Sequence, residues 1–520
     1  MVPRPAPQFP TPPLIPEYFA GREVLITGAT GFMGKVLVER LLWTCPDIGR
    51  LHLLMRHKRD VAPDKRLALL KQSQVFDVVR ERCPQQLDKL CMVPGDVTKR
   101  RFGFDQSALN QLNQVSVVFH SAATLKFDEP LSVAAEQNVR PVLTLMDICD
   151  QLPNMQVLVH VSTAYSNAEL AEVEERVYPA PVTPEHLLAL VDALPASMLQ
   201  EITPRLIAPK PNTYTFTKAV AESAVSERAV TARYACAIFR PTIVVSSLRH
   251  PFPGWIENLN GPSGVVAGAG KGLLRVLRCG AQRRADMMPV DICIDTLIAV
   301  AWETGIDNLR EARVYQCASS SHAATWGQFR ERMLRLVREH PFDNVLWYPY
   351  GVICENTVVQ KVLEAVLQTA PLCVAHCVAR ACGLKQKPSL WTACKRLQAM
   401  NQALQFFATR HWSFRTTRVQ QLAHRLHPDD QKLYNLRPET IDWEQHCVDF
   451  VKGARRYLLR ERDDDIHAAR RRMRILYLIH KATLLFAIFT MCRLTIRTAP
   501  AILWGVAALT RQRNKSALLS

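Results

Sequence analysis

Three glycines, each three residues from the next, constrain the fold of this chain most strongly. Gly28, Gly31 and Gly34 follow the apolar run 23–26 and precede residues 35–43, in which apolar side chains recur at helical spacing. A strand, a glycine turn and a helix in this order form a dinucleotide-binding unit, in which a pyrophosphate lies against the N–H groups of the helix N-terminus. The sequence therefore predicts a cofactor site, with a purely structural turn as the alternative. The same turn contains the other predicted contacts, Thr30, Phe32 and Met33.

The residues after the next apolar run distinguish between the two nicotinamide dinucleotides. Residues 51–55 have strand character, and four basic residues follow them, Arg56, His57, Lys58 and Arg59. A ribose with a free 2′-hydroxyl usually meets Asp or Glu at this position, whereas a 2′-phosphate needs cationic donors. We therefore expect Arg56 and Lys58 to bind the 2′-phosphate of NADPH. The alternative is that the basic run is a solvated loop.

Apolar, strand-like runs alternate with helical segments from Arg22 to about Cys236. The candidate strands are Val24–Ile26, Leu51–Leu54, Cys91–Val93, Val115–His120, Val157–Ser162 and Cys236–Phe239. This alternation predicts an α/β fold of the Rossmann type, a doubly wound parallel sheet with helices on both faces. Seven prolines between residues 168 and 212 indicate long loops, which would suit a lid over a substrate.

Two turns that follow predicted strands are candidates for further cofactor contacts. Asp96 and Val97 can meet the adenine edge, and Ala122 lies where the backbone must pass close to the dinucleotide. The glycine spacing resembles that of the extended short-chain dehydrogenase/reductase superfamily. This resemblance implies that Asn138, in the following helix, anchors a water molecule or a lysine, with a plain helix asparagine as the alternative.

Tyr214 and Lys218 are the central candidates for catalysis. Residues four apart on a helix share one face, so both side chains would point at one site. An ammonium near a phenol lowers the pKa of the phenol, which makes Tyr214 a candidate general acid/base; a chance pair on a solvated helix face is the alternative. Thr163 best matches the superfamily's catalytic Ser/Thr at the end of a central strand, with Ser162 as its neighbour, and would hold the substrate carbonyl.

A more specific resemblance rests on seven segments. They are 214–219, 239–244, 251–262, 288–291, 411–414, 441–443 and 453–459. These segments resemble the alcohol-forming fatty acyl-CoA reductases, and the resemblance extends from about residue 16 to residue 460. Pro141 stands where the family usually has a glycine, and the segment after Phe414 lacks the family's frequent asparagine. Neither departure touches the candidate catalytic residues.

The resemblance implies a two-step reduction. A thioester carbonyl of a long-chain fatty acyl-CoA takes a hydride from NADPH, and Tyr214, helped by Thr163, protonates or stabilises the oxyanion. Loss of coenzyme A gives an aldehyde, and a second NADPH gives the primary alcohol. Lys218 is also expected to bind the nicotinamide ribose, and no cysteine is expected to form an acyl-enzyme. The alternatives are a hydroxysteroid- or sugar-type extended dehydrogenase and a catalytically silent NADP-binding scaffold.

Composition narrows the class of partner and the compartment. The formal net charge is +18, and a phosphate-rich cofactor, a phosphate-rich substrate and an anionic membrane surface would account for it. The sequence carries no nucleic-acid motif, so nucleic acid is not an expected partner. Its fifteen cysteines show neither a paired framework nor metal-ligand spacing, which indicates reduced thiols in a protein that faces the cytosol and binds no metal.

The chain is expected to divide into four parts. They are a disordered proline-rich lead (1–16), an NADP-binding reductase domain (17–340), a mostly helical C-terminal domain (341–462) and a membrane anchor with its tail (470–520). A homo-oligomer is left open.

The apolar tail predicts attachment to a membrane. Residues 475–492 are mostly apolar, a second apolar stretch covers 499–509, and four arginines precede them, Arg470, Arg471, Arg472 and Arg474. A basic flank favours the cytosolic side of a single span or a shallow hairpin; a docking helix pair buried in a dimer is the alternative. Residues 358–382 could form a further membrane-lying or core helix. The endoplasmic reticulum and the peroxisome are the expected membranes.

Overall fold

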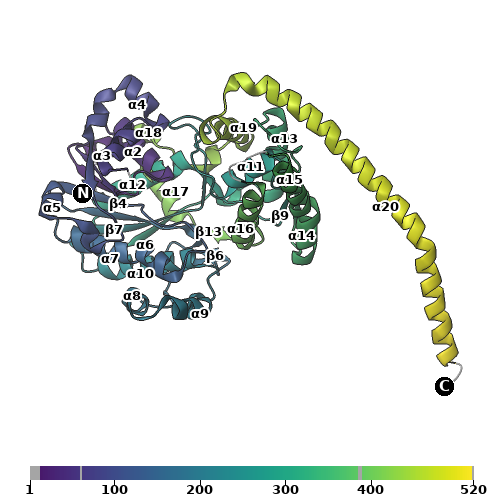
Figure 1. Ribbon diagram of the computed structural model, residues 1–520. Coiled ribbons are helices and arrows are strands. Elements are labelled where there is room, and N and C mark those ends of the chain that lie inside the picture. The colour runs from purple at the N-terminus through teal and green to yellow at the C-terminus, as the bar shows by residue number, and fades with distance from the viewer. Residues whose placement is uncertain (1–11, 59–60, 384–388, 518–520) are drawn as a thin grey trace, which may run out of the picture.

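The computed structural model describes residues 12–58, 61–383 and 389–517. One sheet of seven parallel strands lies at its centre (Figure 1). In spatial order the strands are β11 (Arg313–Cys317), β7 (Ala235–Pro241), β5 (Val157–Val161), β4 (Val115–His120), β1 (Glu23–Thr27), β2 (Leu51–Met55) and β3 (Leu90–Pro94). The strand order reverses between β1 and β4, so the carboxyl ends of these two strands border the crevice in which such sheets bind ligands.

Alternate residues of β1 enter two hydrophobic cores, one on each face of the sheet. The four long helices that cover the sheet are α2 (Phe32–Thr44), α7 (Arg140–Cys149), α10 (Thr213–Ala229) and α12 (Val290–Asp307). Val24 and Ile26 pack in the core that contains α2 and α12, whereas Leu25 packs in the core that contains α7 and α10. Strands covered on both faces are apolar throughout rather than alternating. The predicted doubly wound α/β fold is confirmed.

Shorter helices connect the strands. They are α1 (Ile15–Phe19), α3 (Pro63–Lys71), α4 (Asp77–Arg82), α5 (Gln106–Gln111), α6 (Leu131–Asn138), α8 (Pro184–Ala193) and α9 (Ala196–Ile207). In the expected proline-rich lead, residues 1–11 lie outside the described residues, while Ile15 and Pro16 already belong to α1. The indole N–H of Trp302 donates to the carbonyl of Pro13 at 2.9 Å, so this end of the chain is attached to α12.

All six predicted strands are present in the sheet, and a seventh strand, β11, was not predicted. β11 pairs with β7 from Arg313↔Ala237 to Cys317↔Pro241 and forms one edge of the sheet. The proline-rich segment 168–212, for which we expected long loops, instead contains α8 and α9, which lie along one edge of the body (Figure 1). Pro184 occupies the first turn of α8, where a proline costs no hydrogen bond.

A second, mostly helical lobe adjoins the sheet. Its helices are α11 (Pro262–Gly270), α13 (Trp326–Glu339), α14 (Thr357–Leu363), α15 (Ala370–Ala381), α16 (Leu390–Ala408) and α19 (Trp443–Gly453). The helices α17 (Thr417–Arg425) and α18 (Pro428–Leu433) lie instead against the sheet, where Val419 and Leu422 pack in the core that contains α12. A one-turn π-helix, η6 (Glu364–Thr369), joins α14 to α15.

In the described part of the chain, three short strand pairs lie outside the central sheet, and two of them join segments on both sides of residue 341. They are β9 (Val276–Arg278) with β12 (Val352–Cys354), β8 (Ile243–Val245) with β10 (Met287–Pro289), and β6 (Glu172–Val173) with β13 (Ser413–Phe414). The first and last pairs cross residue 341, so the lobe draws on both expected domains. Gly254 and Gly453 also meet backbone to backbone across it, since a Cβ on Gly453 would lie 1.8 Å from the carbonyl oxygen of Gly254.

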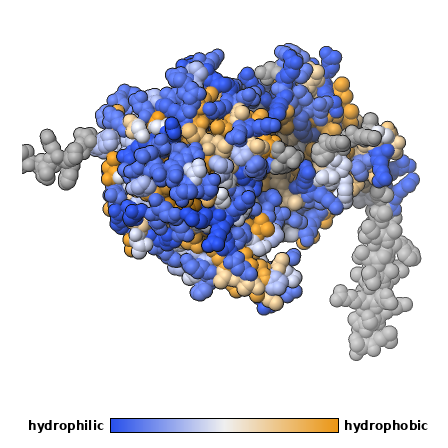
Figure 2. All heavy atoms as spheres, turned by 60° about the vertical axis from the view of Figure 1, so that its left-hand side comes forward, coloured by the Kyte–Doolittle hydropathy of each residue, from blue (hydrophilic) through white to orange (hydrophobic). Residues whose placement is uncertain are grey.

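A single helix, α20 (Ile466–Ala517), leaves the body and ends the chain (Figure 1). Its first turns, as far as His480, contact the body: Ala469 and Met473 are buried, Arg472 donates to the carbonyl of Val345 at 2.9 Å, and Trp347 donates to His480 at 3.2 Å. Hydrophilic residues cover most of the face of the body drawn in Figure 2. Within the described residues, Thr357–Ala381 and Ile466–Arg497 are long and apolar enough to cross a membrane.

Candidate active site

The glycine turn brings β1 and β4 into backbone contact. Gly28 has φ +77°, and a Cβ there would lie 2.8 Å from the amide nitrogen of Ala122. That amide donates to the hydroxyl of Thr27 at 3.2 Å, and the same hydroxyl lies 2.8 Å from Nδ1 of His120. A Cβ on Gly34 would lie 2.2 Å from the Gly28 carbonyl oxygen. Both glycines are therefore required by the packing, and Ala122 lies beside the turn as expected.

The side chains between these glycines face the protein rather than the turn. Phe32 stacks on Trp255 with ring centroids 5.2 Å apart, and Met33 packs against the core under α2. Gly31 is the N-cap of α2, so no side chain caps the first N–H groups of this helix. Phe32 and Met33 can therefore offer a dinucleotide their backbone N–H groups at the helix N-terminus, which is the surface that suits a pyrophosphate.

A cationic pair lies at the carboxyl end of β2. The Arg56 side chain is 56% exposed, and its guanidinium lies 3.7 Å from the carboxylate of Asp96. Arg66, from α3, donates to the carbonyl of Arg56 at 2.6 Å and to the hydroxyl of Thr30 at 3.0 Å. Partial burial and the neighbouring Arg56 charge lower the pKa of Arg66. The sequence analysis missed Arg66, although it follows the basic run by only a few residues.

The other residues expected on the adenosine side are placed as follows. Asp96 accepts hydrogen bonds from the amide and hydroxyl of Thr98, at 3.1 and 2.9 Å, which orients its carboxylate in the turn after β3. Val97 packs against the core under α7. Lys58 is exposed and pairs through its backbone with Val61. Arg59 lies outside the described residues.

Tyr214 and Thr163 meet at the carboxyl end of β5. Asn212 caps α10 by accepting a hydrogen bond from the amide of Thr215 at 2.9 Å, which places Tyr214 in the first turn of the helix. A hydrogen bond joins the hydroxyls of Tyr214 and Thr163. One turn later, the buried ammonium of Lys218 donates to the carbonyl of Val161 at 2.7 Å.

Burial dominates the protonation of both groups on α10. It raises the pKa of Tyr214 to about 12, and the hydrogen bond to Thr163 only partly offsets this shift. Burial lowers the pKa of Lys218 to about 8, and the charge of Glu222 partly opposes the change. The expectation that Lys218 lowers the pKa of Tyr214 is therefore wrong for this structure. The phenol is protonated at neutral pH, the form that can donate a proton.

Ser162 faces away from Tyr214. Its hydroxyl donates to the carboxylate of Glu222 at 2.5 Å, and Glu222 is held by two hydrogen bonds from the guanidinium of Arg240, at 2.6 and 2.8 Å. Glu222 and Arg240 are both buried. Of the two candidate hydroxyls, the structure therefore brings Thr163 to Tyr214 and assigns Ser162 to the buried ion pair.

Asn138 connects the floor of the site to the catalytic helix. Its amide oxygen accepts from the backbone of Thr124 at 2.9 Å, and its amide nitrogen donates to the hydroxyl of Thr217 at 3.0 Å. It therefore holds the turn after β4 against α10, and its recorded hydrogen bonds do not include Lys218.

Two buried histidines lie below the site and were missed in the sequence. His120 and His160 end adjacent strands and stack with ring centroids 5.5 Å apart. Burial, helped by the charge of Lys218, lowers the pKa of His120 to about 3 and also lowers that of His160. Both rings are therefore neutral at physiological pH. The sequence signal that could have identified them is a histidine within an otherwise apolar predicted strand.

The helical lobe supplies an aromatic wall beside Tyr214. The ring of Phe127 lies 5.6 Å from that of Tyr214 and 5.3 Å from that of Phe407, which is in the last turn of α16. Tyr165 lies 5.2 Å from Phe407 and 5.4 Å from Trp412. No local pattern links these residues, because they come from four distant parts of the chain.

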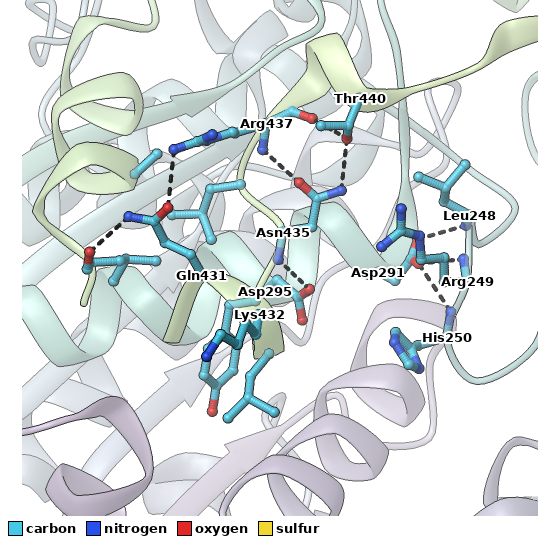
Figure 3. Close-up of a pocket in the computed structure, with 15 residues that line it drawn as sticks. Leu248, Arg249, His250, Asp291, Asp295, Gln431, Lys432, Asn435, Arg437 and Thr440 are labelled. Carbon is cyan, nitrogen blue, oxygen red and sulfur yellow. Dashed lines mark hydrogen bonds between the residues drawn. The ribbon is translucent and has the colours of Figure 1, made fainter. Parts of the chain in front are cut away.

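A separate polar cavity of about 200 Å³ lies between α12 and the segment after α18 (Figure 3). Its two acidic groups already have partners. Asp291 accepts three backbone hydrogen bonds, from Leu248, Arg249 and His250, and Asp295 pairs with Arg40 at 2.8 Å. None of the predicted site residues lines this cavity. The candidate active site is therefore the region around Tyr214, where the glycine turn, Thr163 and Lys218 converge on the carboxyl ends of the strands.

Comparison with known proteins identifies relatives over most of the chain. Residues 26–297 match the NAD-binding model of the male sterility protein family, and residues 367–461 match the Sterile model of that family. The chain is 34% identical to fatty acyl-CoA reductase 1 of Rattus norvegicus over 461 residues, which cover 88% of this chain and 89% of the relative. It is 33% identical to fatty acyl-CoA reductase 2 of Bos taurus over 469 residues, which cover 90% of each chain.

Solved structures share the fold. The reductase domain of a nonribosomal peptide synthetase from Mycobacterium tuberculosis has a TM-score of 0.55 and 17% identity, covering 86% of this chain and 93% of that one. The terminal reductase domain of the myxalamid pathway has a TM-score of 0.54 and 15% identity, covering 84% and 91%.

Replacing Tyr214 with Phe should abolish proton donation while leaving the fold intact. Because only the hydroxyl is lost, we expect turnover to fall roughly 10²–10⁴-fold, with dinucleotide binding unchanged. Steady-state kinetics and a fluorescence titration with the dinucleotide measure the two effects. Full activity of the purified variant would remove Tyr214 from the chemistry.

The two neighbouring hydroxyls supply the matched control. Thr163→Val should reduce turnover, because it removes the partner of the Tyr214 hydroxyl. Ser162→Ala should instead lower the melting temperature, because it leaves one hydrogen bond of buried Glu222 unmade, with turnover in the surviving folded enzyme near the unmodified value. The reverse pattern would assign the catalytic hydroxyl to Ser162.

Proposed function

This chain belongs to the fatty acyl-CoA reductase family, and we propose that it reduces a long-chain fatty acyl-CoA to a primary alcohol with NADPH. Its fold is that of an NAD(P)-dependent oxidoreductase of the short-chain dehydrogenase/reductase type. The observation that carries the proposal is the meeting of Tyr214, Thr163 and Lys218 beside the glycine turn, in a chain that resembles named reductases over nearly its whole length.

The residues of the site suit carbonyl reduction. A bound nicotinamide supplies a hydride in each of two reductions. We propose that Tyr214, protonated at neutral pH, donates its proton to the carbonyl oxygen as negative charge develops there, and that the Thr163 hydroxyl stabilises the same oxygen. Lys218 provides a positive charge in a buried setting, where it acts more strongly than in water.

The proposed reaction converts the thioester to the alcohol in two successive reductions. The first reduction of the thioester gives a hemithioacetal, which loses coenzyme A as a thiol and leaves an aldehyde. The second reduction, with a second hydride and a second proton, gives the alcohol. Each acyl-CoA therefore consumes two reduced dinucleotides and two protons, and the same oxygen is protonated beside Tyr214 in both steps.

Arg56 and Arg66 support NADPH as the donor. A nicotinamide cofactor follows from the family, and the choice between the two dinucleotides depends on the carboxyl end of β2. Two guanidinium groups lie there, that of Arg66 on Thr30 of the glycine turn and that of Arg56 near Asp96, at the edge where a 2′-phosphate would be placed. The carboxylate of Asp96, which could accept from a free 2′-hydroxyl, is already engaged by Thr98 and lies near Arg56.

Membrane attachment through α20 completes the proposal. Residues Ile466–Arg497 meet the length and hydropathy of a membrane span, and most of the apolar side chains from Ile475 to Ile496 are exposed. Four arginines at the start of the helix favour the cytosolic side for the catalytic body. We propose the membrane of the endoplasmic reticulum or of the peroxisome, and a division into the lead 1–16, the reductase domain 17–340, the helical domain 341–462 and the anchor 470–520.

Membranes that contain the full-length protein should convert acyl-CoA to alcohol. A panel of acyl-CoA thioesters of different chain length, incubated with NADPH, should give primary alcohols with two molecules of NADPH consumed for each alcohol released. Chromatography of the lipids and absorbance at the nicotinamide band measure the two quantities. Accumulation of aldehyde with one NADPH consumed would show a single reduction, and no product with any thioester would contradict the function.

Arg66→Ala should weaken NADPH binding selectively. Loss of one charge-assisted hydrogen bond to a phosphate should raise the Kd of NADPH about 10- to 100-fold, with the Kd of NADH nearly unchanged. Lys65→Ala, on the same helix and with the same loss of charge, is the matched control and should leave both values unchanged. Parallel loss of both affinities in the Arg66 variant would assign Arg66 a structural role.

Truncation after Lys481 should release the protein from membranes. This cut keeps the turns of α20 that pack on the body, including Met473 and Tyr477, and removes the exposed apolar stretch that would span the bilayer. The full chain should stay in the pellet after a carbonate wash, whereas the truncated chain should appear in the supernatant and retain activity on a short, water-soluble acyl-CoA. Full-length protein in the supernatant would show that α20 is a docking element.

A further inference from the structure

We propose that the exposed face of α14 and α15 lies on the same lipid bilayer that α20 enters, so that the body contacts the membrane at a second surface. This inference rests on the proposed membrane anchor. The surface, called here the valine stripe, consists of five large apolar side chains spaced by four residues or eight, Val358, Val362, Val366, Val374 and Val378. Such spacing places them along one side of the helix.

The valine stripe is uncovered, while the opposite side of the same helix is packed. Val358, Val366 and Val374 are 70%, 61% and 63% exposed. On the packed side Gln368 is buried, and its side-chain oxygen accepts a hydrogen bond from the backbone of Arg275 at 2.9 Å. This packing holds the helix against the body, although its length would allow it to cross a bilayer. It can lie along the interface with one apolar face inserted.

The charges around the stripe favour an anionic lipid surface. The described residues of 357–383 and 389–410 include five lysines and arginines and a single acid, Glu364. Glu364 is half-buried, and this burial raises its pKa. Lys361, Arg380 and Lys395 are exposed beside the apolar residues. An apolar stripe with basic neighbours is the pattern of a membrane-lying helix, whereas an interface between two copies would place these positive charges against one another.

The position of α20 brings the stripe to the same membrane. Trp347 donates to His480 of α20 at 3.2 Å, Tyr350 stacks on the same imidazole at 5.0 Å, and Tyr348 lies 5.2 Å from Tyr477. Tryptophan and tyrosine are enriched where a helix meets the bilayer surface. The segment that carries this aromatic cluster continues directly into β12 and α14, on the edge of the body toward which α20 departs (Figure 1).

The stripe is also connected to the catalytic centre. α16 packs on α15, and the last turn of α16 places Phe407 against Phe127, whose ring lies beside that of Tyr214. An acyl chain that partitions into the bilayer would therefore meet, at the valine stripe, the helix pair that ends at the active site. The surface would serve substrates that dissolve in lipid and would be dispensable for substrates that dissolve in water.

Site-specific photocrosslinking tests the contact directly. p-Benzoylphenylalanine in place of Val374, in the full chain reconstituted into phosphatidylcholine vesicles with ~30% phosphatidylserine, should crosslink phospholipid on irradiation. The same group in place of Val230, which is exposed at the end of α10, should not. Crosslinks between two copies of the chain would show that the stripe is a subunit interface, and absence of any crosslink at position 374 would show a surface that faces water.

Kinetics separate this proposal from the proposed function. In the same vesicles, the double variant Val366→Glu/Val374→Glu should lose roughly tenfold in kcat/KM for palmitoyl-CoA, which partitions into lipid, and keep its activity on octanoyl-CoA. Val230→Glu should leave both activities unchanged. Equal loss with both thioesters would mean damage to the fold, and no loss with either would overturn the docking surface. If the unmodified chain reduces neither thioester, the proposed function fails instead.

Discussion

The buried ion pair between Glu222 and Arg240 holds α10, the helix that carries Tyr214 and Lys218, on the sheet, and the arrangement at Tyr214 depends on this pair. Glu222 lies on α10 one turn after Lys218, and Arg240 lies near the end of β7. The guanidinium also donates to the carbonyls of Glu174 and Arg176, at 3.1 and 2.9 Å. Such a pair contributes little net stability, but removal of one partner leaves a buried charge and costs about 3–5 kcal/mol. Its main effect here is to fix the register of α10 against β5 and β7.

Local patterns were enough to predict the glycine turn, six strands and the pair Tyr214 and Lys218, because each depends on residues close in sequence. The roles of these residues stay predictions, although their placement is now known. Arg66 and Phe407 escaped sequence reasoning because only the folded chain brings them to the site. The pKa of Tyr214 is raised, opposite to expectation, because burial, which the sequence does not specify, outweighs the hydrogen bond to Thr163.

The helical lobe contributes to the candidate active site as well as to the base of α20, the proposed anchor. Its aromatic residues close one side of the site, its strands pair with segments of the first expected domain, and its base holds the first turns of α20. A boundary drawn at residue 341 from composition cannot represent this interleaving, because β9 and β6 find their partners beyond it. The helical lobe and the sheet therefore pack as one unit, even though the expected domain boundary falls at residue 341.

The contact between Gly254 and Gly453 has a mechanical consequence. Two backbones without side chains meet there, and a Cβ on Gly254 would lie 2.0 Å from the carbonyl oxygen of Asp449. The joint is thus nearly incompressible: no displacement can bring α19 closer to the loop that contains Gly254. Movement of α19 relative to the loop that contains Gly254 is therefore restricted to rotation about the contact between Gly254 and Gly453, or to separation of the two segments. This contact acts as a pivot, about which a tilt of α19 would open or close the space on the opposite side.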